Sequence, residues 1–358
     1  MKRKFVAALF PNFPQIRDYL VPLIGKKYSA YNSIIQLLYH IQEFRQTLFA
    51  EGNLFNFFQD RMRHYYSSIS TEKFVELLPK TFTSQERTLF EILERLLIET
   101  PYQDLFDMTV LATADGDNYE DDHPVWKKLD LQLISNSDKL KTENPKVFVH
   151  FEDALQRCIG SKEDKTIENV DGYISSTFYW VITKLPKYVL CQIKRRYRQF
   201  DEFDSQPYYA LPFPIANMID FDKYYKFGWL NEVVATRYKL MAIIFTDFRT
   251  MFTTHYAILI RIEGVWVLFS DDKISFPEYD RAVNLAKLNM KISKTASLLL
   301  YKRVKEYMDD TPFRLEAKEV DLNIDDSSVL EESDIEQEII YFDRLQLPPV
   351  NILLYHRQ

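Results

Sequence analysis

The chain has 358 residues, 46% of them hydrophobic, which is enough for one large domain or two ordinary ones with a substantial core. It holds only 7 glycines and neither glycine-rich phosphate-binding motif, GxGxxG or GxxxxGK[ST], so nucleotide binding by such loops is excluded. A formal charge of -7 argues against a general nucleic-acid binder.

The two cysteines, Cys158 and Cys191, are far apart in the sequence, which excludes a disulfide framework and a cysteine-rich zinc site. This pattern fits a reducing compartment, and we expect a cytoplasmic or nuclear protein. No apolar run is long enough to span a membrane, and the apolar stretch after Met1 to Lys4 is too short for a signal peptide. We therefore expect no cofactor, no bound metal and no membrane partner.

The first strongly predicted helix has a polar and aromatic start. From Ile34 to Phe44 apolar residues recur at helical spacing, which predicts a helix with one buried face. The residues before them include Ser29, Asn32 and Ser33. Either Asn32 or Ser33 caps this helix, or the polar start of the helix frames a reaction.

Helices are predicted for most of the first hundred residues. A second helix is expected around residues 53–66, and a third in residues 84–99 with an apolar stripe from Leu89 to Leu97. Residues 112–123 are acidic but lack the glycine and glutamate positions of an EF-hand, so we interpret them as a solvated loop. From Trp180 onward, runs of aliphatic and aromatic residues predict strands. Helices followed by strands predict an α+β fold.

Charge divides the end of the chain from the rest. Residues 305–338 hold 13 Asp and Glu against 3 Lys and Arg, which predicts a mobile acidic segment between a domain over residues 1–304 and an apolar C-terminal segment, 339–358, that docks back. Residues 320–328 also resemble, loosely, a strand-adding motif that binds ubiquitin-like modifiers. The basic run at 194–198 is interpreted as the solvated end of a strand, and nucleic acid is not an expected partner.

Two separated motifs together resemble the ubiquitin-specific proteases, the papain-like deubiquitinases. The family's first box, N-x-G-x-T-C-Y-x-N-S-x-x-Q, is matched in its second half by Asn32, Ser33 and Gln36. The family's late box, a histidine-tyrosine pair followed by a strand and W-x-x-F-[DN]-D, is matched by His255, Tyr256, Trp266, Phe269 and Asp271. Further stretches at 182–200, 211–214 and 296–303 match in the same order, so the resemblance covers roughly residues 20 to 304.

The resemblance implies an α+β, papain-like fold of the ubiquitin-specific protease type, with a helical thumb, a β-rich palm and reduced, zinc-free fingers. It also implies ubiquitin or a ubiquitin-like protein as a partner, and a larger protein complex as a further one. Such enzymes place a cysteine at a helix N-terminus, where the helix dipole favours the thiolate, beside a histidine that a carboxylate or amide orients.

The resemblance also assigns each catalytic position to a residue of this chain, and most positions are altered. Ser29 stands at the nucleophilic cysteine, His255 at the base and Asp271 at the second acidic position. Ile24 stands where the family has the asparagine that donates to the oxyanion, and Ser270 stands at the first acidic position. Thr253 and Thr254 replace a glycine pair before the histidine.

Three hypotheses follow. The first is an inactive pseudo-deubiquitinase that binds ubiquitin or a ubiquitin-like protein or scaffolds a complex. The second is an active ubiquitin carboxyl-terminal hydrolase with a Ser29-His255-Asp271 triad, since serine and cysteine triads share their geometry. The third is a structural component of a larger assembly. In each case we expect Trp266 and Phe269 to lie in the core, Cys191 to be buried and Cys158 to lie near a helix end.

Overall fold

The computed structural model describes residues 3–12, 20, 22–24, 28–44, 69–72, 75, 89–98, 103–114, 125–132, 150–159, 163–169, 172–194, 212–225, 235–248, 254–305 and 311–319. The chain divides into two compact units. One consists of Met1–Leu9 with Val320–Gln358, and helix α1 (Arg3–Leu9) is its described part. The other, Phe10–Glu319, contains every other described element.

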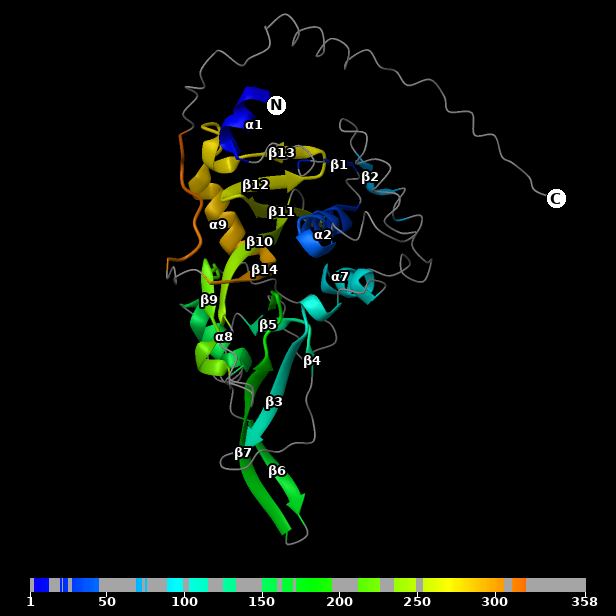
Figure 1. The fold of residues 1–358 in the computed structure, drawn as a ribbon, viewed down its shortest axis with the longest axis vertical. Coiled ribbons are helices and arrows are strands. Elements are labelled where there is room, and N and C mark those ends of the chain that lie inside the picture. Colours follow the sequence, from blue (N-terminus) through cyan, green and yellow to red (C-terminus); the bar gives the residue numbers. More distant parts are fainter. Residues whose placement is uncertain are drawn as a thin grey trace, which may run out of the picture. The chain divides into compact units, whose positions relative to one another are not determined.

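The larger unit is built on an eight-stranded sheet (Figure 1). Seven of its strands follow the order β13-β12-β11-β10-β14-β8-β5, and β9 pairs with β10 beside this path. All neighbours are antiparallel except β5 and β8, which are parallel. The strands are β5 (Leu129–Gln132), β8 (Tyr188–Lys194), β9 (Met218–Asp220), β10 (Arg237–Phe248), β11 (Thr254–Ile262), β12 (Val265–Ser270), β13 (Lys273–Ser275) and β14 (Ala296–Val304).

A second, antiparallel sheet has the strand order β4-β3-β7-β6. Its strands are β3 (Met108–Ala114), β4 (Val125–Trp126), β6 (Glu163–Asn169) and β7 (Gly172–Lys184), and a separate parallel pair is formed by β1 (Leu23–Ile24) and β2 (Ile69–Ser70). Strands therefore begin well before Trp180, and residues 112–114 belong to β3 instead of the predicted loop. These strands could not be predicted from the sequence, because they are short or lie beside acidic stretches and therefore show only weak alternation of apolar and polar residues.

The described helices are fewer than the strands. Besides α1, they are α2 (Ser29–Tyr39), α7 (Leu89–Ile98), α8 (Phe151–Ile159) and α9 (Leu285–Thr295), with short 3-10 turns η3 (Gln103–Leu105), η5 (Asp222–Tyr224) and η6 (Pro277–Tyr279). The predicted stripe of α7 is buried, with Leu93 fully covered. The helix predicted around residues 53–66 lies outside the described residues. Helices and mixed sheets in one unit confirm the α+β prediction.

The central strands of the large sheet are buried on both faces. Leu299 and Tyr301 of β14 join Leu155 of α8 and Ile292 of α9 in the main hydrophobic cluster. The alternate residue Leu300 is also 99% covered, with 1% of its surface exposed. A strand covered on both faces reads as a continuous apolar run, which is why the sequence of β14 signalled a strand so clearly. The α2 helix contacts β11, β12 and α7 and lies beside them in Figure 1.

Three smaller predictions about the core can be checked. Trp266, Phe269 and Cys191 are all buried, as predicted. Cys158 is half-buried at the end of α8, and burial raises the pKa of its thiol to about 11. Its position near a helix end is therefore confirmed, but the thiol is shielded from water.

Residues 311–319 pack against the rest of the larger unit, which differs from the mobile acidic segment predicted for 305–338. Leu315 is 1% exposed, and its backbone exchanges two 2.9 Å hydrogen bonds with the side chain of Asn289. Phe313 packs edge-on against Trp266, and Lys318 Nζ lies 3.0 Å from the buried carboxylate of Glu278. Two apolar anchors thus outweigh the acidic composition of this stretch. Residues 320–358 lie outside the described residues, so the boundaries at 304 and 338 stay predictions.

None of the helices in the described ranges is long and apolar enough to cross a bilayer. The same residues contain no group of three or more His, Cys, Asp or Glu placed to hold a metal ion.

Candidate active site

Ser29, at the predicted nucleophile position, is the first residue of α2. Its side chain is buried, with 4% exposed, and its Oγ accepts a 3.1 Å hydrogen bond from the backbone N–H of Tyr256 in β11. The N-cap residue is Tyr28, which makes no side-chain capping bond, so the predicted cap at Asn32 or Ser33 is wrong. Ser29 instead links the start of α2 to the strand that carries the predicted base.

His255 is the second residue of β11 and is also buried, with 6% exposed. Its Nε2 lies 3.3 Å from Oγ of Ser270, the last residue of β12, and 3.4 Å from Oδ2 of Asp271. The pleat of β11 therefore carries the imidazole beside the β12–β13 turn. The same nitrogen faces both residues at the family's acidic positions.

Asp271 occupies that turn with a φ of 53°, in the left-handed region that short polar residues tolerate better than most. Its side chain is only 3% exposed. Oδ2 accepts no well-aligned hydrogen bond from the described residues, and His255 Nε2 approaches it at 3.4 Å. A buried carboxylate with one weakly compensated oxygen depends strongly on the donor to its other oxygen.

That donor is Asn32, whose role the sequence analysis missed. Its Nδ2 donates a 3.0 Å hydrogen bond to Asp271 Oδ1, and its Oδ1 accepts a hydrogen bond from the hydroxyl of Thr71. All three side chains are buried. The motif match at Asn32 could have indicated a role in the site. An asparagine near a helix start also fits a helix cap, and only the folded structure distinguishes a cap from a donor to Asp271.

Ile24, at the predicted oxyanion position, lies in β1 opposite Ser70 of β2, and Ser70 directly precedes Thr71. The main chain at Ile24 is thus tied to the segment that reaches Asn32. Thr254 is the first residue of β11, whereas Thr253 lies outside the described residues.

The polar groups of this site form contacts that differ from those of a working triad. Among the described residues, Ser29 makes no hydrogen bond with His255, and its oxygen instead accepts from a main-chain N–H. A serine nucleophile requires a base that takes its proton. The site holds an imidazole beside a carboxylate, but the nucleophile-to-base link is not formed.

A second histidine, His40, lies behind the site at the end of α2. Its Nδ1 is 2.7 Å from the carbonyl oxygen of Gln36, and its ring packs 5.2 Å from that of Phe269. Burial lowers the pKa of His40 to about 4, so the ring is neutral at physiological pH. His40 therefore packs the C-terminal end of α2 against β12 as an uncharged ring.

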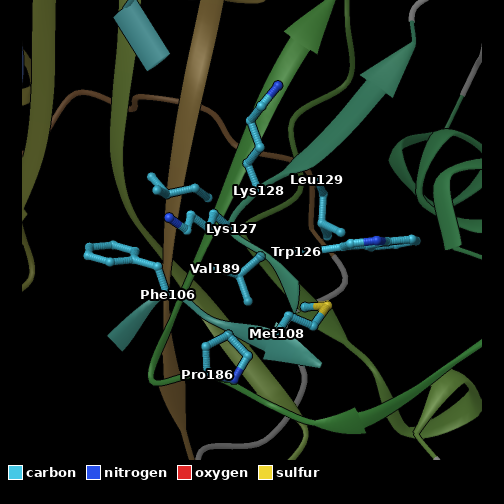
Figure 2. A pocket seen from close by; sticks show the side chains of 9 residues that line it. Phe106, Met108, Trp126, Lys127, Lys128, Leu129, Pro186 and Val189 are labelled. Carbon is cyan, nitrogen blue, oxygen red and sulfur yellow. The ribbon is translucent and has the colours of Figure 1, made fainter. Parts of the chain in front are cut away.

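A separate hollow lies where β3 and β4 meet β8 (Figure 2). Its apolar lining includes Phe106, Met108, Trp126 and Val189, with Lys127 and Lys128 beside them, and the empty volume is about 150 Å³. Ligand pockets usually measure about 300 to 1,000 Å³. The hollow is too small for a substrate site, and neither Ser29 nor His255 lines it.

The solved structures that resemble the chain include SAGA DUB modules. A yeast SAGA DUB module with a variant Sgf73 is 15% identical, with a TM-score of 0.55 over 83% of this chain and 70% of that one. The SAGA DUB module of Ubp8, Sgf11, Sus1 and Sgf73 bound to monoubiquitin is 15% identical, with a TM-score of 0.57, and the match covers 85% of this chain and 75% of that one. The Ubp8, Sgf11, Sus1 and Sgf73 module bound to ubiquitin aldehyde is 15% identical, with a TM-score of 0.57, and the match covers 82% of this chain and 71% of that one. These likenesses concern the fold.

No curated protein sequence matches the chain. The family model described as ubiquitin carboxyl-terminal hydrolase matches residues 26–301. Together with the solved structures, this match confirms the papain-like fold of the ubiquitin-specific protease type. The zinc-free state of the fingers stays a prediction. The match covers most of the chain and includes both sequence boxes, and the chain therefore belongs to the ubiquitin carboxyl-terminal hydrolase family, in its ubiquitin-specific protease branch.

Proposed function

We propose that this protein is a pseudo-deubiquitinase of the cytoplasm or nucleus, which binds ubiquitin or a ubiquitin-like protein without hydrolysing its C-terminal bond. The observation that carries the proposal is the contact of Ser29. Its Oγ accepts the N–H of Tyr256 at 3.1 Å in place of a hydrogen bond with His255. A residue at the nucleophile position thereby acts as a structural link between α2 and β11.

The chemistry of the serine hydroxyl favours the same conclusion. A cysteine thiol has a pKa of about 8.5 and reacts as a thiolate that the helix N-terminus stabilises. An alcohol is far less acidic, so the helix dipole alone does not ionise Ser29. Without a base that accepts its proton, the hydroxyl is a poor nucleophile.

The oxyanion position adds an independent obstacle. Ile24 has an aliphatic side chain where the family has an asparagine, so it offers no side-chain donor to a developing negative charge. Removal of one such donor lowers the rate of acyl transfer by roughly 100-fold to 1,000-fold. The proposal therefore rests on two separate losses, of the thiol and of the donor.

Binding is proposed from the family and from its structural neighbours. Two of the similar modules are bound to monoubiquitin and to ubiquitin aldehyde, and they contain several subunits. The chain is also rich in aromatic residues, with 27 Phe and 23 Tyr, the kind of residue that dominates protein interfaces. A role as a scaffold within a larger complex belongs to the same proposal.

A titration of fluorescently labelled ubiquitin tests the binding claim. Ala30→Arg places a bulky cation in the first turn of α2 beside Ser29, and we expect it to weaken binding at least tenfold. Ala286→Arg makes the same change on an exposed turn of α9 and serves as the control. No binding by the parent at about 100 µM ubiquitin leaves only the scaffold role, and equal binding by both variants argues against a site at α2.

The alternative function is an active hydrolase that uses Ser29, His255 and Asp271. The observation that favours it is the retained, buried pair of His255 and Asp271, 3.4 Å apart. A ubiquitin C-terminal fluorogenic substrate distinguishes the two functions. The alternative predicts a parent rate that disappears in Ser29→Ala, with Ser33→Ala, the same change one turn further along α2, as the control.

A further inference from the structure

Residues 311–319, which we call the strap, follow the part of the chain that the family model matches. That part, residues 26–301, is called the family domain below. The strap packs on this domain and runs alongside α9 (Figure 1). Seven of its nine residues are exposed, so the strap lies on the surface with few side chains turned inward. A short bound peptide lies on a protein in the same way.

The main chain of the strap is held by hydrogen bonds from the family domain. The N–H of Phe313 donates a 2.7 Å hydrogen bond to the carbonyl oxygen of Ile215. Further along, the side chain of Asn289 in α9 accepts from the N–H of Leu315 and donates to its carbonyl oxygen, each at 2.9 Å. A side-chain amide can make both bonds because it carries a donor and an acceptor. These contacts recognise an extended backbone whatever side chains it carries.

Three side chains of the strap add chemical specificity. Phe313 packs edge-on against Trp266, with the ring centroids 5.2 Å apart, and Leu315 belongs to the main hydrophobic cluster. The Nζ of Lys318 lies 3.0 Å from Oε2 of Glu278, and the N–H of the same lysine donates a 2.7 Å hydrogen bond to the Glu278 carbonyl oxygen. The site therefore fits an aromatic residue, an aliphatic residue two positions later and a lysine three positions after that.

The family domain supplies a buried carboxylate that needs a cation from outside it. The side chain of Glu278 is 3% exposed, and Lys318 is its one ion-pair partner among the described residues. A buried charge without a partner is strongly unfavourable. Removal of the strap would leave Glu278 in that state. The domain therefore favours an occupant that carries a cation at this position.

The strap site is separate from the region of Ser29. Trp266 and Phe269 are three residues apart on β12, so their side chains point to opposite faces of the sheet. Phe313 packs against Trp266, whereas His40 of α2 packs against Phe269. The strap and α2 thus lie on opposite faces of β12, and an occupant of the strap site does not cover α2.

We propose that the strap fills a peptide-binding site of the family domain, and that a partner protein uses the same site through a segment of the same chemistry. The contacts of the strap identify that segment as extended, with the spacing of Phe313, Leu315 and Lys318. The strap is then an intramolecular competitor. A tethered segment competes at an effective concentration on the order of millimolar, so a partner binds when its own segment displaces the strap.

Fluorescence anisotropy with a labelled nine-residue peptide of the strap sequence, TPFRLEAKE, tests the proposal on the full chain. Leu315→Ser removes the buried anchor of the chain's own strap, and we expect this variant to bind the peptide at least about tenfold more tightly than the parent. Lys318→Glu places two carboxylates together and releases the strap by a second route if the first variant does not fold. Glu316→Ser changes an exposed neighbour and should bind the peptide as weakly as the parent.

Two further changes locate the peptide on the released Leu315→Ser chain. Asn289→Ala removes the amide that bonds the backbone of the occupant, and it should weaken peptide binding at least about tenfold. A peptide with glutamine in place of its lysine should also bind about tenfold more weakly. In the background of Glu278→Gln the two peptides should bind within about twofold of each other, because the charge pair is absent from both complexes.

Three results would overturn the proposal. Equal peptide binding by the parent and the released variants would show that the strap does not compete for the site. Loss of the folded state in both released variants, or no binding by the folded ones at about 1 mM peptide, would make the strap an integral part of the domain. A dimer of the parent that the peptide dissociates, detected by light scattering, would make the occupant the strap of a second copy instead of a partner's segment.

Discussion

Replacement of Asn32 by alanine removes the donor that holds the carboxylate of Asp271. In the parent, Asn32 Nδ2 donates to Asp271 Oδ1 at 3.0 Å and its Oδ1 accepts from the Thr71 hydroxyl. Asp271 Oδ2 has no well-aligned hydrogen bond among the described residues. The substitution therefore leaves a buried carboxylate with the 3.4 Å approach of His255 as its remaining close polar contact.

The cost follows from these contacts. A hydrogen bond to a charged group contributes about 1.5 to 3 kcal/mol, and a neutral one about 1 kcal/mol. Loss of the bond to Asp271 and of the bond from Thr71 should lower the free energy of unfolding by about 3 kcal/mol. In the background of Asp271→Asn, where the acceptor is uncharged, the same substitution should cost about half as much.

Urea unfolding at pH 7, followed by tryptophan fluorescence, measures this free energy. With a slope of about 3 kcal/mol per molar urea, the midpoint should fall on the order of 1 M. Asn217→Ala is the matched control, because that asparagine bonds Thr311 and Pro312 at an exposed position. If the two variants unfold within about 0.5 kcal/mol of each other, the buried network does not hold the site together.

Three further predictions concern buried side chains. His40 is neutral in the folded protein with a pKa of about 4, against 6.5 for the ordinary side chain, so it contributes stability above pH 6.5 that is lost as the pH falls towards 4. The loss should reach about 3 kcal/mol, and urea midpoints measured from pH 7 to 4.5 should fall less steeply in His40→Phe. Leu315→Ala should lower the free energy of unfolding by about 2 to 4 kcal/mol, because the side chain is 1% exposed. The control Val125→Ala, at a side chain that is 50% exposed, should lower it by under about 0.5 kcal/mol. Equal losses for the two variants in urea unfolding would show that residues 311–319 do not pack in the fold. Burial raises the pKa of both Cys158 and Cys191, so iodoacetamide at pH 8 should modify neither thiol until urea unfolds the protein, as mass spectrometry would show.

The elements that frame the site could be predicted because they carry strong local signals. The helical spacing from Ile34 onward and the apolar runs around Trp266 and in β14 each belong to one buried element, and periodicity detects such elements directly. The order of the motifs then predicted that Ser29, His255 and Asp271 would converge. The structure brings their elements together, with Ser29 beside Tyr256 and His255 beside Asp271.

Contacts over long sequence distances could not be predicted in the same way. Asn32 and Asp271 are 239 positions apart, and an asparagine near a helix start fits a cap equally well. Residues 311–319 have the composition of a solvated segment. They pack because Phe313 contacts Trp266 and the backbone of Leu315 bonds the side chain of Asn289. In both cases the partner residues, which the local sequence does not reveal, decide the outcome.

The central claim is that this chain has kept the family fold and lost the chemistry of the family's nucleophile. A single-turnover assay with a ubiquitin C-terminal fluorogenic substrate, at protein in large excess over substrate, tests it most directly. We predict that the parent and Ser29→Ala release fluorophore at the same rate as buffer. Release by the parent that Ser29→Ala abolishes and Ser33→Ala preserves would contradict the claim.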